Sequence, residues 1–211
     1  MKTWRVSSRA ALAVSAAVLA AGSLLAAPPA NAPGAKQPAK PQMDEKAMMD
    51  LYMKAATPGP EHQSLAKLAG NWKLDVTAWM SPGAPPEKST STAKFETLLG
   101  GRYLQQTVSG TMGGQPFEGI GLEGFDNVSK ERWGTWIDNM GTGTMLSHGK
   151  CAAGAKICTM TGTMNDPLTG KPCSIREVMT MTGDNTFTFD MYGPDPAGKE
   201  VHMMQILYTR Q

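Results

Sequence analysis

From Gly70 to its C-terminus, the chain consists of short segments with strand-like alternation, joined by tight turns such as Gly100-Gly101 and Gly113-Gly114. No connection is long enough to hold a crossover helix, so neighbouring segments must pair antiparallel. A sheet of about ten strands has to curl or close, and closure also removes exposed edge strands. The pattern therefore predicts a mainly β fold, a single antiparallel up-and-down β-barrel of roughly ten strands. A two-sheet sandwich is the alternative, which the short turns disfavour.

Strands are expected at residues 72–80, 90–99, 102–112, 117–125, 132–139, 144–150, 156–164, 172–182, 186–192 and 200–209. One or two helices should precede them. Residues 44–56 place Met48, Leu51, Tyr52 and Ala55 on one helical face. A shorter helix is expected at 59–69, with Leu65 and Leu68 as its apolar side and Gly70 as its C-cap.

Residues 1–32 have the features of a secretory signal peptide: a basic start, the apolar run Ala10–Ala27 and a small-x-small pattern at 30–32. An uncleaved membrane anchor is the alternative, which the short, alanine-dominated run disfavours. Residues 33–42 are a Pro/Ala/Lys-rich flexible linker, and residues 43–211 form the folded domain. We therefore expect a periplasmic or secreted protein with no stable membrane insertion after signal cleavage.

The charge of the domain argues against nucleic acid as a partner. The chain has a net charge of +2, and five of its bases lie in residues 1–42 without any acid. Removing these five bases leaves about −3 for the domain, whereas nucleic-acid binding needs a basic face.

Three cysteines, Cys151, Cys158 and Cys173, lie in the expected exported domain. An oxidising compartment permits one disulfide, either Cys151–Cys158 across a hairpin or Cys158–Cys173 on neighbouring strands. Three free, buried thiols are an equally plausible alternative.

Sequence motifs for catalysis or cofactor binding are lacking. The chain has no G-x-S-x-G, no H-E-x-x-H and no cysteine spacing typical of zinc sites. The glycines of Gly119–Gly124 open no helix, so they are expected to let the strand bend or a neighbour pack closely. His62, His148 and His202 are expected as surface or capping residues, and we predict no metal or cofactor.

The 16 methionines suit a core or cavity lining that tolerates varied ligands. Copper(I) binding by thioethers is the less favoured interpretation, because no tight repeat occurs beyond Met179-Thr180-Met181.

The strand 132–139 carries the main open question. Arg132, Trp136 and Asp138 share one of its faces, and Trp133 lies on the other. If Trp136 points into the barrel, Arg132 and Asp138 do too and are available to hold a carboxylate ligand. If they point outward, they are solvated surface charges.

Several motifs resemble those of the DUF1579 family of uncharacterised bacterial proteins: residues 59–76, SPGAPP at 81–86, LLGGRYLQQ at 98–106, GQPFEGIGLEGFDN at 114–127 and TWIDNMGTG at 135–143. The likeness spans residues 59–210. The family resembles calycin-like barrels, the grouping that contains lipocalins. The resemblance implies ligand binding in the barrel, and it implies no catalytic residue.

The leading hypothesis is thus an exported barrel that binds a small apolar or amphipathic ligand, with a candidate lining of Trp72, Arg102, Phe117, Arg132, Trp133, Trp136, Asp138, Met179 and Met191. One alternative is an enzyme that uses the same cavity, with Asp138 or Glu177 as acid/base and Arg102 or Arg132 holding an anion. The other is a ligand-free envelope interaction protein.

Overall fold

The structure, a computed structural model, describes residues 43–81, 83–167 and 169–211. The expected signal peptide and linker, residues 1–32 and 33–42, lie outside the described residues. In the part that is described, none of the helices is long and apolar enough to cross a membrane.

Helix α1 (Glu45–Ala56) forms where the sequence predicts it, and the Asp44 carboxylate caps it by accepting the Ala47 N–H at 2.7 Å. Its apolar side is not buried, contrary to what the helical spacing suggests: Met48, Leu51 and Tyr52 are all exposed. The helix is held at its C-terminal end, where the Asn127 side chain donates to the Ala55 carbonyl at 2.9 Å. The helical spacing of apolar residues therefore predicted the helix correctly, but no part of the described structure covers its apolar face.

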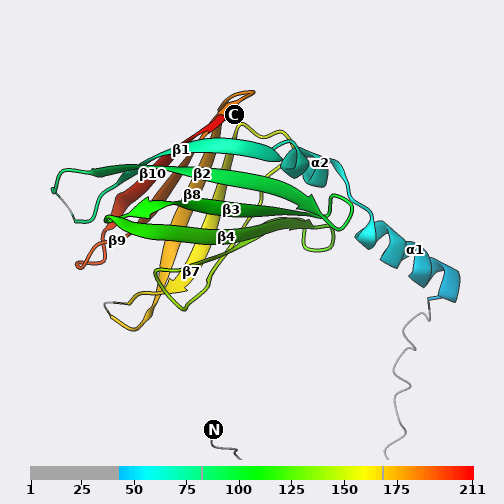
Figure 1. The fold of residues 1–211 in the computed structure, drawn as a ribbon. Helices are drawn as coiled ribbons and strands as arrows, with labels where there is room; N and C mark the ends of the chain where they lie inside the picture. The colour runs from blue at the N-terminus through cyan, green and yellow to red at the C-terminus, as the bar shows by residue number, and fades with distance from the viewer. Residues whose placement is uncertain (1–42, 82, 168) are drawn as a thin grey trace, which may run out of the picture. The chain divides into compact units, whose positions relative to one another are not determined.

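Helix α2 (Pro60–Ala66) begins at Gly59, whose N–H donates to His62 Nδ1 at 3.0 Å. Leu65, in the helix, and Leu68, just after it, are buried in the core as predicted. The helix is shorter than expected because its C-cap is Lys67, and Gly70 already belongs to the first strand. Helix α2 packs against β3 and β4 (Figure 1).

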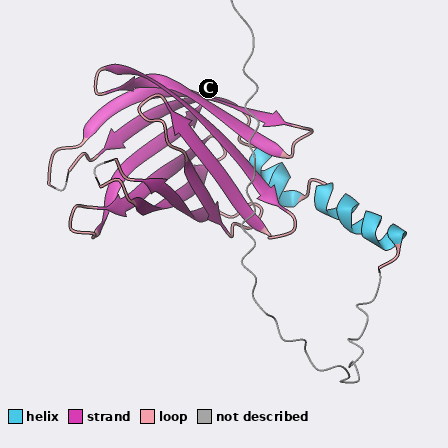
Figure 2. Cartoon of the chain, turned by 90° about the horizontal axis from the view of Figure 1, so that it is seen from below, coloured by secondary structure: helices cyan, strands magenta, loops and turns pink. Residues whose placement is uncertain are grey.

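Ten antiparallel strands follow and close into a barrel in simple sequence order, with β1 paired to β10 (Figures 1 and 2). The predicted single up-and-down barrel is confirmed, with boundaries that shift by a few residues. The strands are β1 (Gly70–Ala78), β2 (Glu87–Leu98), β3 (Tyr103–Met112), β4 (Gln115–Asp126), β5 (Glu131–Asp138), β6 (Met145–Gly149), β7 (Ile157–Asn165), β8 (Pro172–Gly183), β9 (Thr186–Pro194) and β10 (Glu200–Arg210).

The barrel has two different ends. At one, here called the α2 end, β1 starts and β10 finishes, and α2 lies against the barrel. At the other, the hairpin end, lie tight turns such as Gly113-Gly114, where both residues have positive φ (56° and 78°). Glycine adopts positive φ without the steric cost of a Cβ, so two glycines in succession explain this predicted turn.

An aromatic core fills the barrel beneath α2. Trp72 has no exposed surface; its ring packs edge-on against Phe187 with centroids 5.0 Å apart, and Phe187 stacks on Tyr208 at 4.2 Å. The Trp72 indole N–H donates to the Leu68 carbonyl at 2.8 Å, and the Arg210 guanidinium lies 4.3 Å above its ring. These contacts join the first strand, the last two strands and the segment after α2.

The glycines of β4 make room for two tryptophans on opposite faces of the sheet. A Cβ on Gly119 would lie 2.3 Å from the Trp136 ring, on the inner face. A Cβ on Gly124 would lie 2.7 Å from the Trp133 ring, on the outer face. The predicted role of these glycines, close packing of a neighbour, is confirmed.

Replacing Gly119 by alanine should therefore destabilise the protein by about 1–3 kcal/mol, because the added methyl group displaces the Trp136 ring. Urea unfolding followed by tryptophan fluorescence measures this change. The matched control is Gly143→Ala, where an added Cβ meets nothing within 4 Å. Equal unfolding midpoints for the two variants would contradict this packing of Trp136.

Candidate functional site

The structure answers the question about β5: Arg132, Gly134, Trp136 and Asp138 form the inner face, with Arg132 and Gly134 buried. The inner face also receives most other predicted lining residues, by strand alternation from buried neighbours. The inward-pointing members of the predicted set are Trp72, Phe117, Arg132, Trp136, Asp138, Met179 and Met191.

Two predicted lining residues lie elsewhere. Trp133 points outward and packs against Tyr103, with ring centroids 5.8 Å apart. Arg102 lies in the turn between β2 and β3, where its guanidinium donates to the carbonyls of Ala56 (3.1 Å) and Leu99 (2.9 Å). The structure gives Arg102 the task of holding the end of α1 against the barrel.

Trp136 and Asp138 act together toward the hairpin end. The indole N–H of Trp136 donates to Asp138 Oδ2 at 2.8 Å, and Phe117 stacks on the ring with centroids 6.4 Å apart. The second carboxylate oxygen of Asp138 accepts the Met140 N–H at 3.0 Å. Both oxygens therefore accept hydrogen bonds from protein groups, and the ion-pair partner of Arg132 is Glu123.

A belt of buried polar side chains crosses the middle of the barrel. Arg132 forms an ion pair with Glu123, in which its Nε donates to Oε2 at 2.9 Å. A second pair in the belt is Gln106 and Tyr208, in which the Gln106 amide donates to the Tyr208 hydroxyl at 3.0 Å. Burial of this kind is costly unless each group is paired, and the Arg132 charge is balanced by Glu123.

Glu177 is the buried acid of this belt, with 7% of its surface exposed. Burial raises the pKa of its carboxyl from 4.5 to about 7, and the nearby Glu123 charge also raises it. A hydrogen bond with Ser147 and the Arg132 charge act in the opposite direction. Glu177 therefore changes its protonation near neutral pH, inside the barrel.

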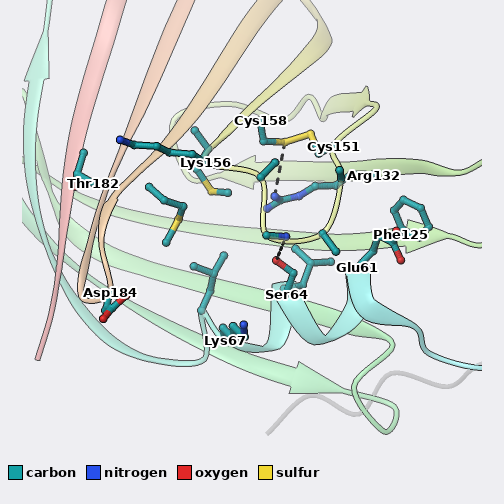
Figure 3. Close-up of a pocket in the computed structure, with 18 of the residues that line it drawn as sticks. Glu61, Ser64, Lys67, Phe125, Arg132, Cys151, Lys156, Cys158, Thr182 and Asp184 are labelled. Atoms are coloured by element: carbon teal, nitrogen blue, oxygen red, sulfur yellow. Dashed lines mark hydrogen bonds between the residues drawn. A yellow bond between two sulfur atoms is a disulfide. The ribbon is translucent and has the colours of Figure 1, made fainter.

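A cavity of about 490 Å³ lies at the α2 end (Figure 3). It is formed by α2 with the residues just after it, the loop 151–156 between β6 and β7, side chains of β4, β5 and β7, and the ends of β8 and β10. Its apolar surface comes from Leu65, Leu68, Phe125, Met179 and Met181. This volume falls within the usual range for small-molecule sites, about 300–1,000 Å³.

The charged lining of the cavity is predominantly basic, with four basic side chains against two acidic ones. The basic residues are Lys67, Arg132, Lys156 and Arg210, and the acidic residues are Glu61 and Asp184. Arg210 donates to the carbonyls of Ala69 and Lys67 at 2.7 and 2.6 Å. Lys67, Lys156 and Asp184 are exposed, so the exposed charges that a ligand would meet are two basic and one acidic.

A disulfide between Cys151 and Cys158 forms part of the cavity wall, which selects one of the three thiol arrangements left open by the sequence. Its Cα atoms are 5.2 Å apart. Cys173 is a half-buried free thiol. The disulfide lies beside the buried belt: Arg132 Nη1 is 3.8 Å from Cys158 Sγ (Figure 3).

The histidines take structural positions. His62 is buried and caps α2, and its ring meets Phe125 edge-on at 5.8 Å. His202 lies on the outer face of β10, between the rings of Trp79 (4.4 Å) and Tyr192 (4.6 Å). The capping interpretation of His62 is thus confirmed, although the residue is buried.

Sequence reasoning found two cavity residues, Arg132 and Met179, and missed α2 and the loop 151–156. The sequence feature that could have indicated this loop is the run of small residues Ala152-Ala153-Gly154-Ala155 between two cysteines. Its position over α2, where the Gly154 N–H donates to Ser64 Oγ at 3.2 Å, is a tertiary contact that the local sequence does not encode.

Comparison with protein families gives one match: the model of DUF1579, described as a protein of unknown function, matches residues 57–210. No curated protein matches the chain.

Comparison with solved structures finds similar chains. The crystal structure of Rv2717c from M. tuberculosis is 14% identical, with a TM-score of 0.57, and the match covers 74% of this chain and 99% of that one. The redesigned barrel b11L5F_LGL is 17% identical (TM-score 0.38; 70% and 95% covered). EF1p2_mFAP2b, solved bound to DFHBI, is 14% identical (TM-score 0.41; 72% and 99% covered). At this identity, the likeness to Rv2717c shows the fold alone.

The raised pKa of Glu177 predicts a loss of stability as pH rises. The folded protein holds this proton more tightly than the unfolded chain, so the stabilisation is full below pH 4.5 and is lost as pH rises through about 7. Glu177→Gln removes the titration and should make the protein more stable than the native form at about pH 8, by on the order of 2 kcal/mol.

Urea unfolding at a series of pH values measures this difference. The exposed Glu87→Gln is the control and should show no such gain. If Glu177→Gln loses stability equally at all pH values, Glu177 is ionised and fully paired in the folded protein.

Proposed function

Because the chain belongs to the DUF1579 family, whose function is unknown, we propose a function from its geometry: it is an exported protein that binds a small amphipathic ligand with an anionic head group in the α2-end cavity. The observation that carries this proposal is a cavity of about 490 Å³ with an apolar floor and a basic rim. Such sites combine apolar burial with a few placed polar groups.

The floor of the cavity accommodates the apolar part of the ligand. Leu65 and Leu68 are buried and fixed in the core, whereas Met179 and Met181 are only partly buried and pack against it. Thioether side chains adapt to ligands of different shape, so the floor can accept either a flexible alkyl chain or a ring system.

The rim selects the charge of the head group. Arg132 is buried and already paired with Glu123, so it adds little to the charge of the exposed opening. Lys156 on the loop and Lys67 after α2 are exposed and border the opening. They favour a carboxylate, sulfonate or phosphate over an ammonium group, through charge attraction at the opening.

Export is supported by the disulfide. Disulfides persist in oxidising compartments and are rare in the reducing cytosol. Together with the signal-like residues 1–32, the Cys151–Cys158 bond supports a periplasmic or secreted location.

An enzyme is the second candidate, and one observation favours it: Glu177 is a buried acid that titrates near neutral pH beside the Glu123–Arg132 pair. However, Glu177 is not among the residues that line the cavity. Because its carboxyl does not border the cavity, binding is the better-supported function.

We expect dodecanoate to displace the fluorescent anion anilinonaphthalene sulfonate from the cavity, dodecanol to displace it less well, and dodecylammonium least. Fluorescence titration measures the three affinities. Lys156→Glu should weaken dodecanoate binding by about tenfold, equivalent to roughly 1.4 kcal/mol, and leave dodecanol binding unchanged.

The matched control is Lys88→Glu, a charge reversal at the exposed start of β2, which does not line the cavity. If both variants weaken dodecanoate binding equally, the effect comes from the net charge of the protein and not from Lys156 at the cavity. Equal affinity for dodecanoate and dodecylammonium would contradict the proposed head-group selection.

A further inference from the structure

The seam between β6 and β7 is short. Its register comprises three pairs of Cα partners, Leu146↔Thr163, Ser147↔Gly162 and His148↔Thr161, whereas β7 and β8 share nine. Toward the α2 end, the two strands have no further Cα partners in the described register. The Cys151–Cys158 disulfide lies in this unpaired stretch, so a covalent bond joins the two strands where ladder hydrogen bonds stop.

The loop closed by this disulfide is a wall of the cavity. All residues from Cys151 to Lys156 line it, as does Cys158 (Figure 3). Few hydrogen bonds hold the loop against the rest of the barrel: the Gly154 N–H donates to Ser64 Oγ at 3.2 Å, and the Met181 N–H donates to the Lys156 carbonyl at 2.8 Å. The disulfide is therefore the strongest of the described restraints on this wall.

The two sulfur atoms have different surroundings. Cys158 is buried, with 5% of its surface exposed, and its Sγ lies 3.8 Å from Arg132 Nη1. Cys151 is only half-buried and borders the cavity. A thiolate leaving from Cys158 would form beside a guanidinium, whereas an incoming thiolate can reach Cys151 from the cavity.

We propose that Cys151–Cys158 is a thiol–disulfide exchange site for small anionic thiols, and that its reduction opens the cavity wall. The opening matters for function only if the cavity binds a ligand as proposed above, but the exchange chemistry does not depend on it. The basic rim that attracts an anionic head group attracts an anionic thiol equally.

Reduction of the disulfide takes two successive exchange steps and consumes two small thiols. The first thiolate attacks Cys151 Sγ, a new sulfur–sulfur bond forms, and Cys158 leaves as a thiolate beside Arg132. A second thiolate then attacks the sulfur of the bound thiol, releasing the oxidised small disulfide and the Cys151 thiolate. The protein gains two electrons, and the two thiols lose them.

The first test uses the folded protein without denaturant. Reduced glutathione, an anion, should reduce the disulfide faster than cysteamine, a cation, by about tenfold after correction for their rates with a small reference disulfide. Acid quenching, alkylation and peptide mass spectrometry should place the glutathione adduct on Cys151 and not on Cys158.

Two variants sharpen this result. Cys173→Ser removes the free thiol and should change nothing. Glu123→Gln with Arg132→Gln replaces the ion pair by a neutral one and should slow the exchange, because the leaving thiolate loses its cation. If that variant fails to fold, the position of the adduct in the native protein still decides the question.

A disulfide that reacts only in denaturant, equally with both thiols, or through Cys158 would overturn the exchange site. The second part of the proposal is tested by hydrogen exchange: after reduction, amides of residues 150–160 should exchange faster, while those of β2 and β3 stay protected. Unchanged protection would show that the wall stays closed.

Ligand release supplies a separate readout. The dissociation rate of anilinonaphthalene sulfonate should rise by about tenfold on reduction, because affinity changes within one site appear mainly in dissociation. If the dye never binds, the proposed ligand function fails while the exchange result stands. If the dye binds and its dissociation rate stays the same, the inferred link between reduction and the cavity fails.

Discussion

Closure of the sheet between β1 and β10 is the constraint on which the rest of the molecule depends. Their register runs from Trp72↔Arg210 to Ala78↔Met204, so the first strand completes the last. At this join, Arg210 covers the Trp72 ring and also binds the carbonyls that follow α2. The same few contacts therefore close the barrel, fill its core and fix the helix over its end.

In a barrel of eight strands, the inward-pointing side chains just fill the interior. A barrel of ten strands encloses more space than that. This barrel meets that problem in three ways. Aromatic rings fill the space under α2, Trp136 lies flat over the glycines of β4, and a polar belt crosses the middle. The belt is not the most stable solution, because Arg132 and Glu123 lose hydration and burial raises the pKa of Glu177. A purely structural filling would be apolar, so the belt is the feature of the interior that most requires a functional explanation.

The sequence was sufficient for the strand order because turns and alternation are local. Gly113-Gly114 determines its own hairpin, whatever surrounds it. The face of Trp136 was not predictable from β5 alone, since β5 carries a tryptophan on each side. The glycines of β4 contain the missing information: Gly119 and Gly121 share the inner face, and Gly124 lies on the outer one. For α1, amphipathic spacing indicated burial, and the exposed helix shows that spacing specifies a face without specifying its cover.

The candidate site was only half predictable because it is assembled from parts that are distant in sequence. Arg132 and Met179 were identifiable from their strands, but α2 and the loop 151–156 meet them only after closure. The local sequence nevertheless explains why the wall lies there. Pairing between β6 and β7 stops after His148↔Thr161, and Gly149, a weak strand former, follows at once. The missing ladder bonds leave a gap that the flanking cysteines bridge. One stretch of weak strand-forming sequence thus shortens the seam, forms the cavity wall and makes its closure depend on a bond that thiols can break.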